Sequence, residues 1–183
     1  MLLKYTKFFF VISSAIFAGT ASLAGNLSLY SITEGAADEG MTNISSGDEN
    51  VAIGDEALKL NTSGSYNTAV GDEALKANTI GVKNTAIGKN SLFSNIHGQQ
   101  NVGIGFEALK SNTTGGYNTA VGVEANRSNT SGQFNTSVGF ETLETNTSGS
   151  YNTALGARAL RYNTGSYNTA VGIFSLDDNG SGS

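Results

Sequence analysis

The chain has 183 residues, of which 14% are charged, with a formal net charge of −5 and no cysteine. This length predicts one domain, the acidic balance argues against a nucleic-acid-binding surface, and the missing cysteines exclude disulfides, thiolate metal sites and a thiol nucleophile. Glycine is frequent, at 24 residues, but it recurs at fixed intervals, unlike the glycine of low-complexity disorder.

Residues 1–24 are laid out as a secretory signal peptide. Lys4 and Lys7 form a basic start, an apolar run covers 8–18, and Ser22 and Ala24 are the small residues of a cleavage site. A membrane anchor is the alternative, but the run is shorter than the roughly 20 residues that span a bilayer. We therefore expect cleavage after Ala24, no transmembrane segment in the mature chain, and a secreted or cell-surface protein.

Residues 25–46 lead into the repeats. The segment 27–32 alternates polar and apolar residues as a strand does, so 25–46 is interpreted as an N-terminal strand or cap. The repeat domain covers 47–180, and 181–183 form a short tail.

A pentad of the type Asn-Thr-Ala-Val-Gly recurs along the repeat domain with a spacing of 17 residues, except for a last step of 16. Fixed self-similarity of this length predicts stacked coils, each touching only its neighbours. We call the closing glycines of the pentads the repeat glycines. They are Gly54, Gly71, Gly88, Gly105, Gly122, Gly139, Gly156 and Gly172.

The pentad has the composition of a strand. Its second and fourth positions are mostly β-branched and its third is small, as in Thr68, Ala69 and Val70. Positions two and four share one face of a strand, and we expect that face to enter the core. The residue four after each repeat glycine, a leucine such as Leu75 in every coil except at Asn126, should join it there. The pattern predicts an all-β fold, a parallel β-solenoid of about eight 17-residue coils with two short strands each. Helical repeats are the alternative, but only about seven residues separate the two helix breakers of each coil, fewer than an average helix of about 11–12.

Two asparagines per coil occupy fixed positions. In stacked coils their amides come into register and can hydrogen-bond along the stack. The alternative is that asparagine tolerates left-handed backbone at corners. The first asparagine ladder, at the pentad's first position, is Asn50, Asn67, Asn84, Asn101, Asn118, Asn135, Asn152 and Asn168. The second asparagine ladder, seven residues after each repeat glycine, is Asn61, Asn78, Asn95, Asn112, Asn129, Asn146, Asn163 and Asn179.

The motif Asn-[Thr/Ser/Val]-Ala-[Val/Ile/Leu]-Gly followed by Ala-Leu, as in 66–75, resembles the head repeats of trimeric autotransporter adhesins and related bacteriophage tail-fibre repeats. The resemblance covers about 47–179 and includes no stalk and no membrane anchor. It implies a left-handed parallel β-roll, usually trimeric, that binds host or matrix ligands. We also expect the small third position to leave a smooth outer face for a homotrimer, with end-to-end self-assembly as a second way of associating.

One surface row predicts a ligand site for an extracellular protein or glycan. Aromatic residues recur just before the pentad and can stack against sugar rings. The alternative, which we favour, is that they stack on one another. The row is Tyr66, Tyr117, Phe134, Tyr151 and Tyr167.

Catalytic and metal-binding residues are not predicted. His97, the one histidine, falls in a turn, and the acidic pairs 55–56 and 72–73 resemble a solvated face more than a calcium site, because later coils do not repeat them. We expect no catalytic residues, no metal, no cofactor and no nucleic-acid partner. The leading hypothesis is an exported, non-enzymatic solenoid of cell-surface adhesion or extracellular structure.

An ice-binding protein is the alternative function, because regular threonine rows can order water. One threonine row is the pentad's second position, which we expect to face the core. The other threonine row is Thr62, Thr79, Thr113, Thr130, Thr147 and Thr164.

A polysaccharide-active enzyme is the least favoured possible function.

Overall fold

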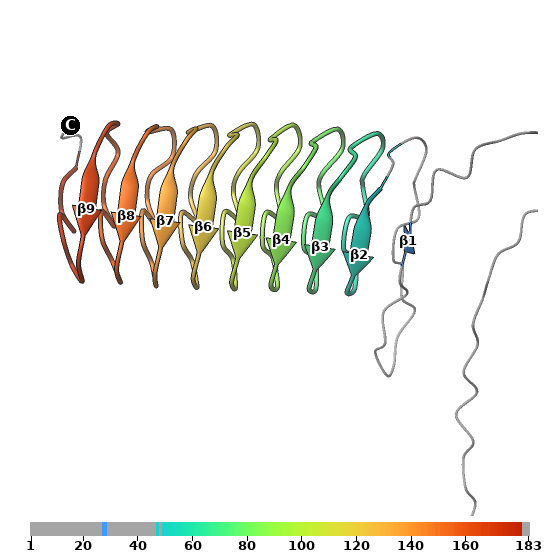
Figure 1. Cartoon of the computed structure of the whole chain (residues 1–183), viewed down its shortest axis with the longest axis horizontal. Helices are drawn as coiled ribbons and strands as arrows, with labels where there is room; N and C mark the ends of the chain where they lie inside the picture. The colour runs from blue at the N-terminus through green and yellow to red at the C-terminus, as the bar shows by residue number, and fades with distance from the viewer. Residues whose placement is uncertain (1–26, 29–46, 48, 181–183) are drawn as a thin grey trace, which may run out of the picture.

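The computed structural model describes residues 27–28, 47 and 49–180. In this part the chain is a parallel β-solenoid with one short strand per coil and no helix (Figure 1). The predicted all-β solenoid of about eight 17-residue coils is therefore confirmed. The predicted signal peptide, the tail and all of 25–46 except 27–28 lie outside the described residues. The strands are β1 (Leu27–Ser28), β2 (Val51–Ile53), β3 (Thr68–Val70), β4 (Thr85–Ile87), β5 (Val102–Ile104), β6 (Thr119–Val121), β7 (Thr136–Val138), β8 (Thr153–Leu155) and β9 (Thr169–Val171).

The strands form one sheet in sequence order, and every neighbouring pair is parallel. Equivalent positions of successive repeats pair directly, as Thr68 does with Thr85 and Ala69 with Ala86. At the N-terminal end, Leu27 pairs with Val51, so part of the predicted N-terminal strand joins the sheet as β1. This in-register stacking places every repeat position in a straight column along the solenoid.

The strand faces are the reverse of our expectation. The third pentad position is buried in every coil, whereas the second and fourth positions are half-buried or exposed, as Thr68, Ala69 and Val70 illustrate. The expectations that valine and isoleucine fill the core, and that the small position forms a smooth outer face, are therefore wrong.

A crowded interior explains the reversal. At Gly103, the one glycine in the third position, an added Cβ would lie 2.6 Å from Ser91 Oγ and 3.3 Å from Leu92 Cγ. Only a small residue fits between the strand and the facing wall of the coil. The core therefore consists of alanines together with leucines of the predicted column, such as Leu75 and Leu109, which are 0% exposed. Burying each leucine contributes about 1.5–3 kcal/mol.

The second half of each coil is a chain of turns, so the expected second strand is wrong within the described residues. The backbone enters the left-handed region at the second and fourth residues after the repeat glycine, for example at Glu73 (φ 57°) and Leu75 (φ 52°). An extended strand cannot include such residues. Hydrogen bonds still connect the coils here, from the Leu75 amide to the Ser91 carbonyl at 3.0 Å.

The repeat glycine is needed for both conformation and space. Gly71 has φ 137°, and a Cβ there would lie 2.6 Å from the carbonyl carbon of Gly88 in the next coil. Residues with a side chain rarely adopt this backbone conformation, and the stacked coil leaves no room for a Cβ atom.

The reversed strand faces predict an asymmetric mutational response in β3. Ala69→Val overfills the interior and should lower the free energy of unfolding by about 1–3 kcal/mol. Val70→Thr, on the outer face, should change it by less than about 1 kcal/mol. Urea denaturation of both variants checks this, and a larger loss for Val70→Thr would contradict the assigned faces.

Candidate functional surfaces

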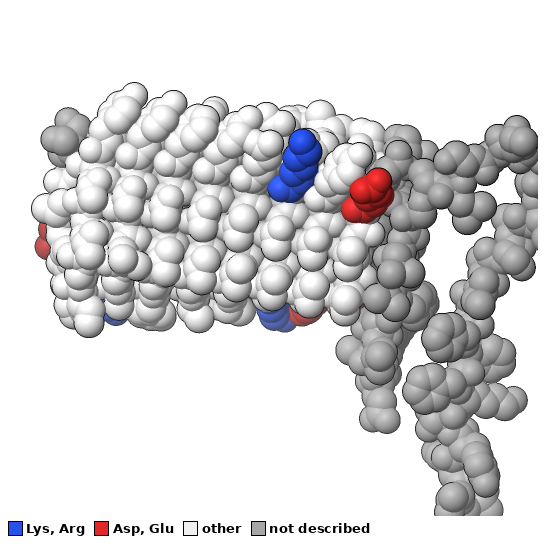
Figure 2. Space-filling view, in the orientation of Figure 1, with Lys and Arg blue, Asp and Glu red and all other residues white. Residues whose placement is uncertain are grey.

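The outer surface of the sheet, which we call the sheet face, carries two regular columns. One is the threonine-rich second pentad position and the other is the branched apolar fourth position, where Ile53 is 38% and Leu155 48% exposed. Neither column contains a charged residue, and Figure 2 shows this side of the solenoid almost free of Lys, Arg, Asp and Glu. The charged residues directly beside the strands belong to the first coils. They are Glu49, Asp55, Asp72, Lys83 and Lys89.

The two threonine rows differ in how their hydroxyls are used. In the second row the hydroxyl donates to the next coil, as from Thr62 to the Thr79 carbonyl (2.8 Å) and from Thr113 to the Thr130 carbonyl (2.9 Å). The pentad threonines, which we expected in the core, point outward instead. Within the described part of the chain their hydroxyls make no hydrogen bond. These outward threonines are Thr68, Thr85, Thr119, Thr136, Thr153 and Thr169.

Four residues of the aromatic row form a continuous stack at the border of the sheet face. The ring centroids lie 4.7 Å apart for Tyr117 and Phe134, and 5.0 Å apart for Phe134 and Tyr151 and for Tyr151 and Tyr167, with nearly parallel planes. Tyr66 is separated from this stack by the coils of Lys83 and Gln100. Since neighbouring rings cover each other's faces, the stack offers mainly ring edges to a ligand.

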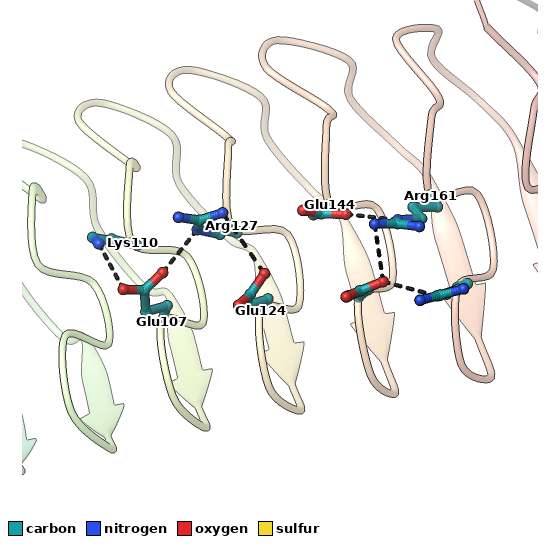
Figure 3. Close-up of polar contacts among 8 residues, drawn as sticks. Glu107, Lys110, Glu124, Arg127, Glu144 and Arg161 are labelled. Atoms are coloured by element: carbon teal, nitrogen blue, oxygen red, sulfur yellow. Dashed lines mark hydrogen bonds and ion pairs between the residues drawn. The ribbon is translucent and has the colours of Figure 1, made fainter.

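The charged residues of later coils gather on the turns after the repeat glycines, which we call the turn wall. Glu107 Oε1 lies 2.6 Å from Lys110 Nζ, and its Oε2 lies 2.8 Å from Arg127 Nε in the next coil (Figure 3). Arg161 likewise pairs with Glu144 at 2.7 Å and with Glu141 at 3.1 Å. The ion pairs therefore join neighbouring coils along the wall.

These contacts shift the ionisation of several groups. Burial opposes the ionisation of Glu107, but Lys110 and Arg127 outweigh it and hold the pKa of this carboxyl below its usual range. Hydrogen bonds from Lys59 and Lys76 lower the pKa of Glu56, and hydrogen bonds to Glu56 and Glu73 raise the pKa of Lys76. The turn wall therefore holds its charges in pairs.

Both asparagine ladders lie inside the coil. The backbone N–H and side-chain Nδ2 of Asn84 donate to Asn67 Oδ1 at 2.9 and 3.1 Å. In the second ladder, Asn78 Nδ2 donates to Asn61 Oδ1 at 2.7 Å. The two ladders meet at the Gly81 carbonyl, which accepts from Asn67 Nδ2 at 2.8 Å and from Asn78 Nδ2 at 3.1 Å.

The alternative interpretation of the ladder asparagines, as left-handed corner residues, is wrong. None of them has positive φ, whereas the residue just before the pentad does, as at Tyr66 (φ 61°) and Tyr117 (φ 60°). Sequence reasoning missed these left-handed positions because Tyr, Glu and Leu are uncommon there. It also missed that the threonine hydroxyls point outward. The small residue at the third pentad position was the available signal, because a narrow interior admits only small side chains from the strand.

The sequence singled out His97 and the acidic residues of the first coils as the groups to consider for catalysis or metal binding. His97 is exposed in a turn, and two acidic residues of the first coils form ion pairs, Asp72 with Lys89 at 2.6 Å and Glu73 with Lys76 at 2.7 Å. Among the described residues, no three His, Cys, Asp or Glu side chains gather as metal ligands. The described residues also include no helix long and apolar enough to cross a membrane.

Comparison of the chain with protein-family models, curated proteins and solved structures finds no match.

The paired carboxylates predict acid sensitivity. Because the folded-state pKa values of Glu56 and Glu107 lie below the ordinary value of 4.5, their contribution to stability is present above pH 4.5 and is lost as pH falls through the folded pKa. The double variant Glu56→Gln, Glu107→Gln should be less stable at neutral pH and lose less stability on acidification. Urea denaturation at about pH 7 and about pH 3 measures this. An unchanged acid response would contradict it.

Proposed function

We propose that the chain is an exported, non-enzymatic β-solenoid of cell-surface adhesion or extracellular structure, which forms a homotrimer through its sheet face. The observation that carries the proposal is the separation of charge. The sheet face has uncharged columns with half-exposed branched apolar residues, whereas the charged residues of later coils lie on the turn wall. Centres of protein interfaces are depleted in charged residues in the same way.

The basis for the trimer differs from the sequence expectation. The small residues of the third pentad position lie inside the coil, so they cannot form the smooth outer surface on which the sequence expectation of a trimer was based. The fourth position does, because Ile87 is 39% and Val171 66% exposed and burying such side chains is favourable. A second copy of the chain carries the same columns with the same spacing between coils, so the side chains of two sheet faces can pack against each other in register.

A non-enzymatic role agrees with the way the ionisable groups are used. General acid–base catalysis needs a titratable group within reach of a substrate, whereas Glu107 and Glu141 are held in ion pairs with neighbouring coils. Adhesion to an extracellular protein or glycan follows the resemblance to adhesin head repeats. In the trimer, the turn wall remains outside and is available to such a ligand.

Ice binding is the second candidate, and one observation favours it. The outward threonines present methyl groups and hydroxyls that have no hydrogen-bond partner among the described residues, in columns with the strand spacing of about 4.8 Å. Ordered water molecules are the ligand that would match a regular row of threonine hydroxyls of this kind. This role requires an open sheet face, so it excludes the trimer.

Substitutions that add charge to the sheet face distinguish the proposed trimer from ice binding. Sedimentation equilibrium of the chain from residue 25 should give three times the chain mass, and Thr136→Lys with Thr153→Lys should give the monomer. The matched control is Ser131→Lys with Ser148→Lys, which adds the same charge on exposed turns and should leave the trimer intact. A monomeric parent protein contradicts the trimer. Thermal hysteresis of the parent that is lost in the threonine variant alone would establish ice binding instead.

A further inference from the structure

The leucine column of the core contains one polar substitution within the described coils. Asn126 replaces leucine between Leu109 and Leu143, is 0% exposed, and has no hydrogen-bond partner at either Oδ1 or Nδ2. The buried apolar residues accordingly form two clusters, one that ends at Ala125 and one that begins at Leu143. The core is therefore interrupted at the junction between the coils of β6 and β7.

The second asparagine ladder breaks at the same junction and again at the next one, and it resumes where Asn179 Nδ2 donates to Asn163 Oδ1 at 3.0 Å. From Asn78 to Asn129, each side-chain amide donates to the asparagine of the preceding coil at 2.7–2.8 Å. Asn146 donates only to the carbonyl of Gly149, in its own turn. The Oδ1 atoms of Asn129 and Asn146 are buried without a partner.

The ion pairs of the turn wall also stop there, as they do between the coils of β4 and β5 within the described chain. Figure 3 shows two separate groups, and within the described coils no ion pair joins one group to the other. The group before the junction is Glu107, Lys110, Glu124 and Arg127, and the group after it is Glu141, Glu144, Arg158 and Arg161.

Side-chain contacts that cross the junction lie beside the strands and at the corner where Thr130 Oγ1 donates to the Thr147 carbonyl at 2.9 Å. The amide of Asn135 donates to Asn118 Oδ1 at 2.9 Å, and the rings of Tyr117 and Phe134 have the shortest centroid distance of the aromatic stack. On the turn side the coils remain joined by backbone hydrogen bonds, such as that from the Asn126 amide to the Thr142 carbonyl at 2.8 Å. The junction is therefore weakened on one side only.

We propose that the β6–β7 junction divides the solenoid into two cooperative blocks and acts as a hinge, opening at the turn wall while the strands and aromatic stack keep the blocks attached. In a repeat array, stability is a sum of coil and junction terms, so the weakest junction decides where the array separates. Other described junctions lack one of these contacts, but only at β6–β7, among the described junctions, do the leucine column, the second asparagine ladder and the ion pairs all lose theirs. The block from β7 to β9 opens at lower free energy than the block from β2 to β6.

Hydrogen exchange of the whole protein, followed by mass spectrometry, tests the hinge. Peptides from β2 to β6 should share one protection level, and peptides from β7 to β9 should lie at least about tenfold lower, with a step at the junction. A glutamate-specific protease should cut first at Glu124, Glu141 or Glu144. A smooth decline of protection towards the C-terminal end, or first cleavage at Glu56 or Glu73, would overturn the proposal.

Two variants identify the cause of the step. Asn126→Leu restores the side chain that other coils carry at this left-handed position, and it should reduce the difference between the blocks to about twofold or less. Asn90→Leu is the matched control, because Asn90 is also left-handed with an unpartnered Oδ1 but is only half-buried outside the leucine column. It should leave the step unchanged. Equal protection gains in both blocks for Asn126→Leu would show that the junction is not the hinge.

Discussion

The structure depends on the hydrogen bonds that buried asparagines make along the solenoid axis. Each coil brings two carboxamides into an interior where an unpaired polar group costs about 1–3 kcal/mol. The side-chain amide can donate to a carbonyl of its own turn, but the Oδ1 atom of Asn67 is paired only because Asn84 of the next coil stacks over it in register. The interior is therefore polar and apolar at once, and register is enforced by the need to pair amides as well as by leucine packing.

This interior determines what the surface can display. Leucine and asparagine fill the coil so completely that the strand contributes only a small side chain to it. The branched residues of the pentad are left outside, in columns that repeat once per coil. An uncharged sheet face is thus a consequence of the core, and it is the feature on which the proposed trimer and the alternative proposal of ice binding both rest. The charged residues of the later coils lie on the turn wall, where they add contacts between coils.

The sequence was sufficient to predict the architecture but not to predict which face of the strand is buried. The 17-residue spacing, the leucine column and the asparagine positions predict a parallel solenoid, because each is a property of stacked coils. The face of Thr68, Ala69 and Val70 was misjudged, since hydrophobicity favours burying valine and the width of the interior is not encoded in any one residue. It depends on how Ser91 and Leu92 pack across the coil. Asn126 was visible in the sequence as a break in the leucine column, but the proposed hinge could be inferred only from the neighbouring asparagine ladder and ion pairs in the structure.

The most direct test is hydrogen exchange of the asparagine side-chain amides, measured by NMR in the folded protein. The exposed side-chain amides of Gln99 and Gln133 provide an internal reference in the same spectrum. If buried carboxamides hold the coils in register, the side-chain protons of Asn67, Asn84 and Asn101 should exchange as slowly as the backbone amides of the strands. Exchange at the rate of the glutamines would contradict the account.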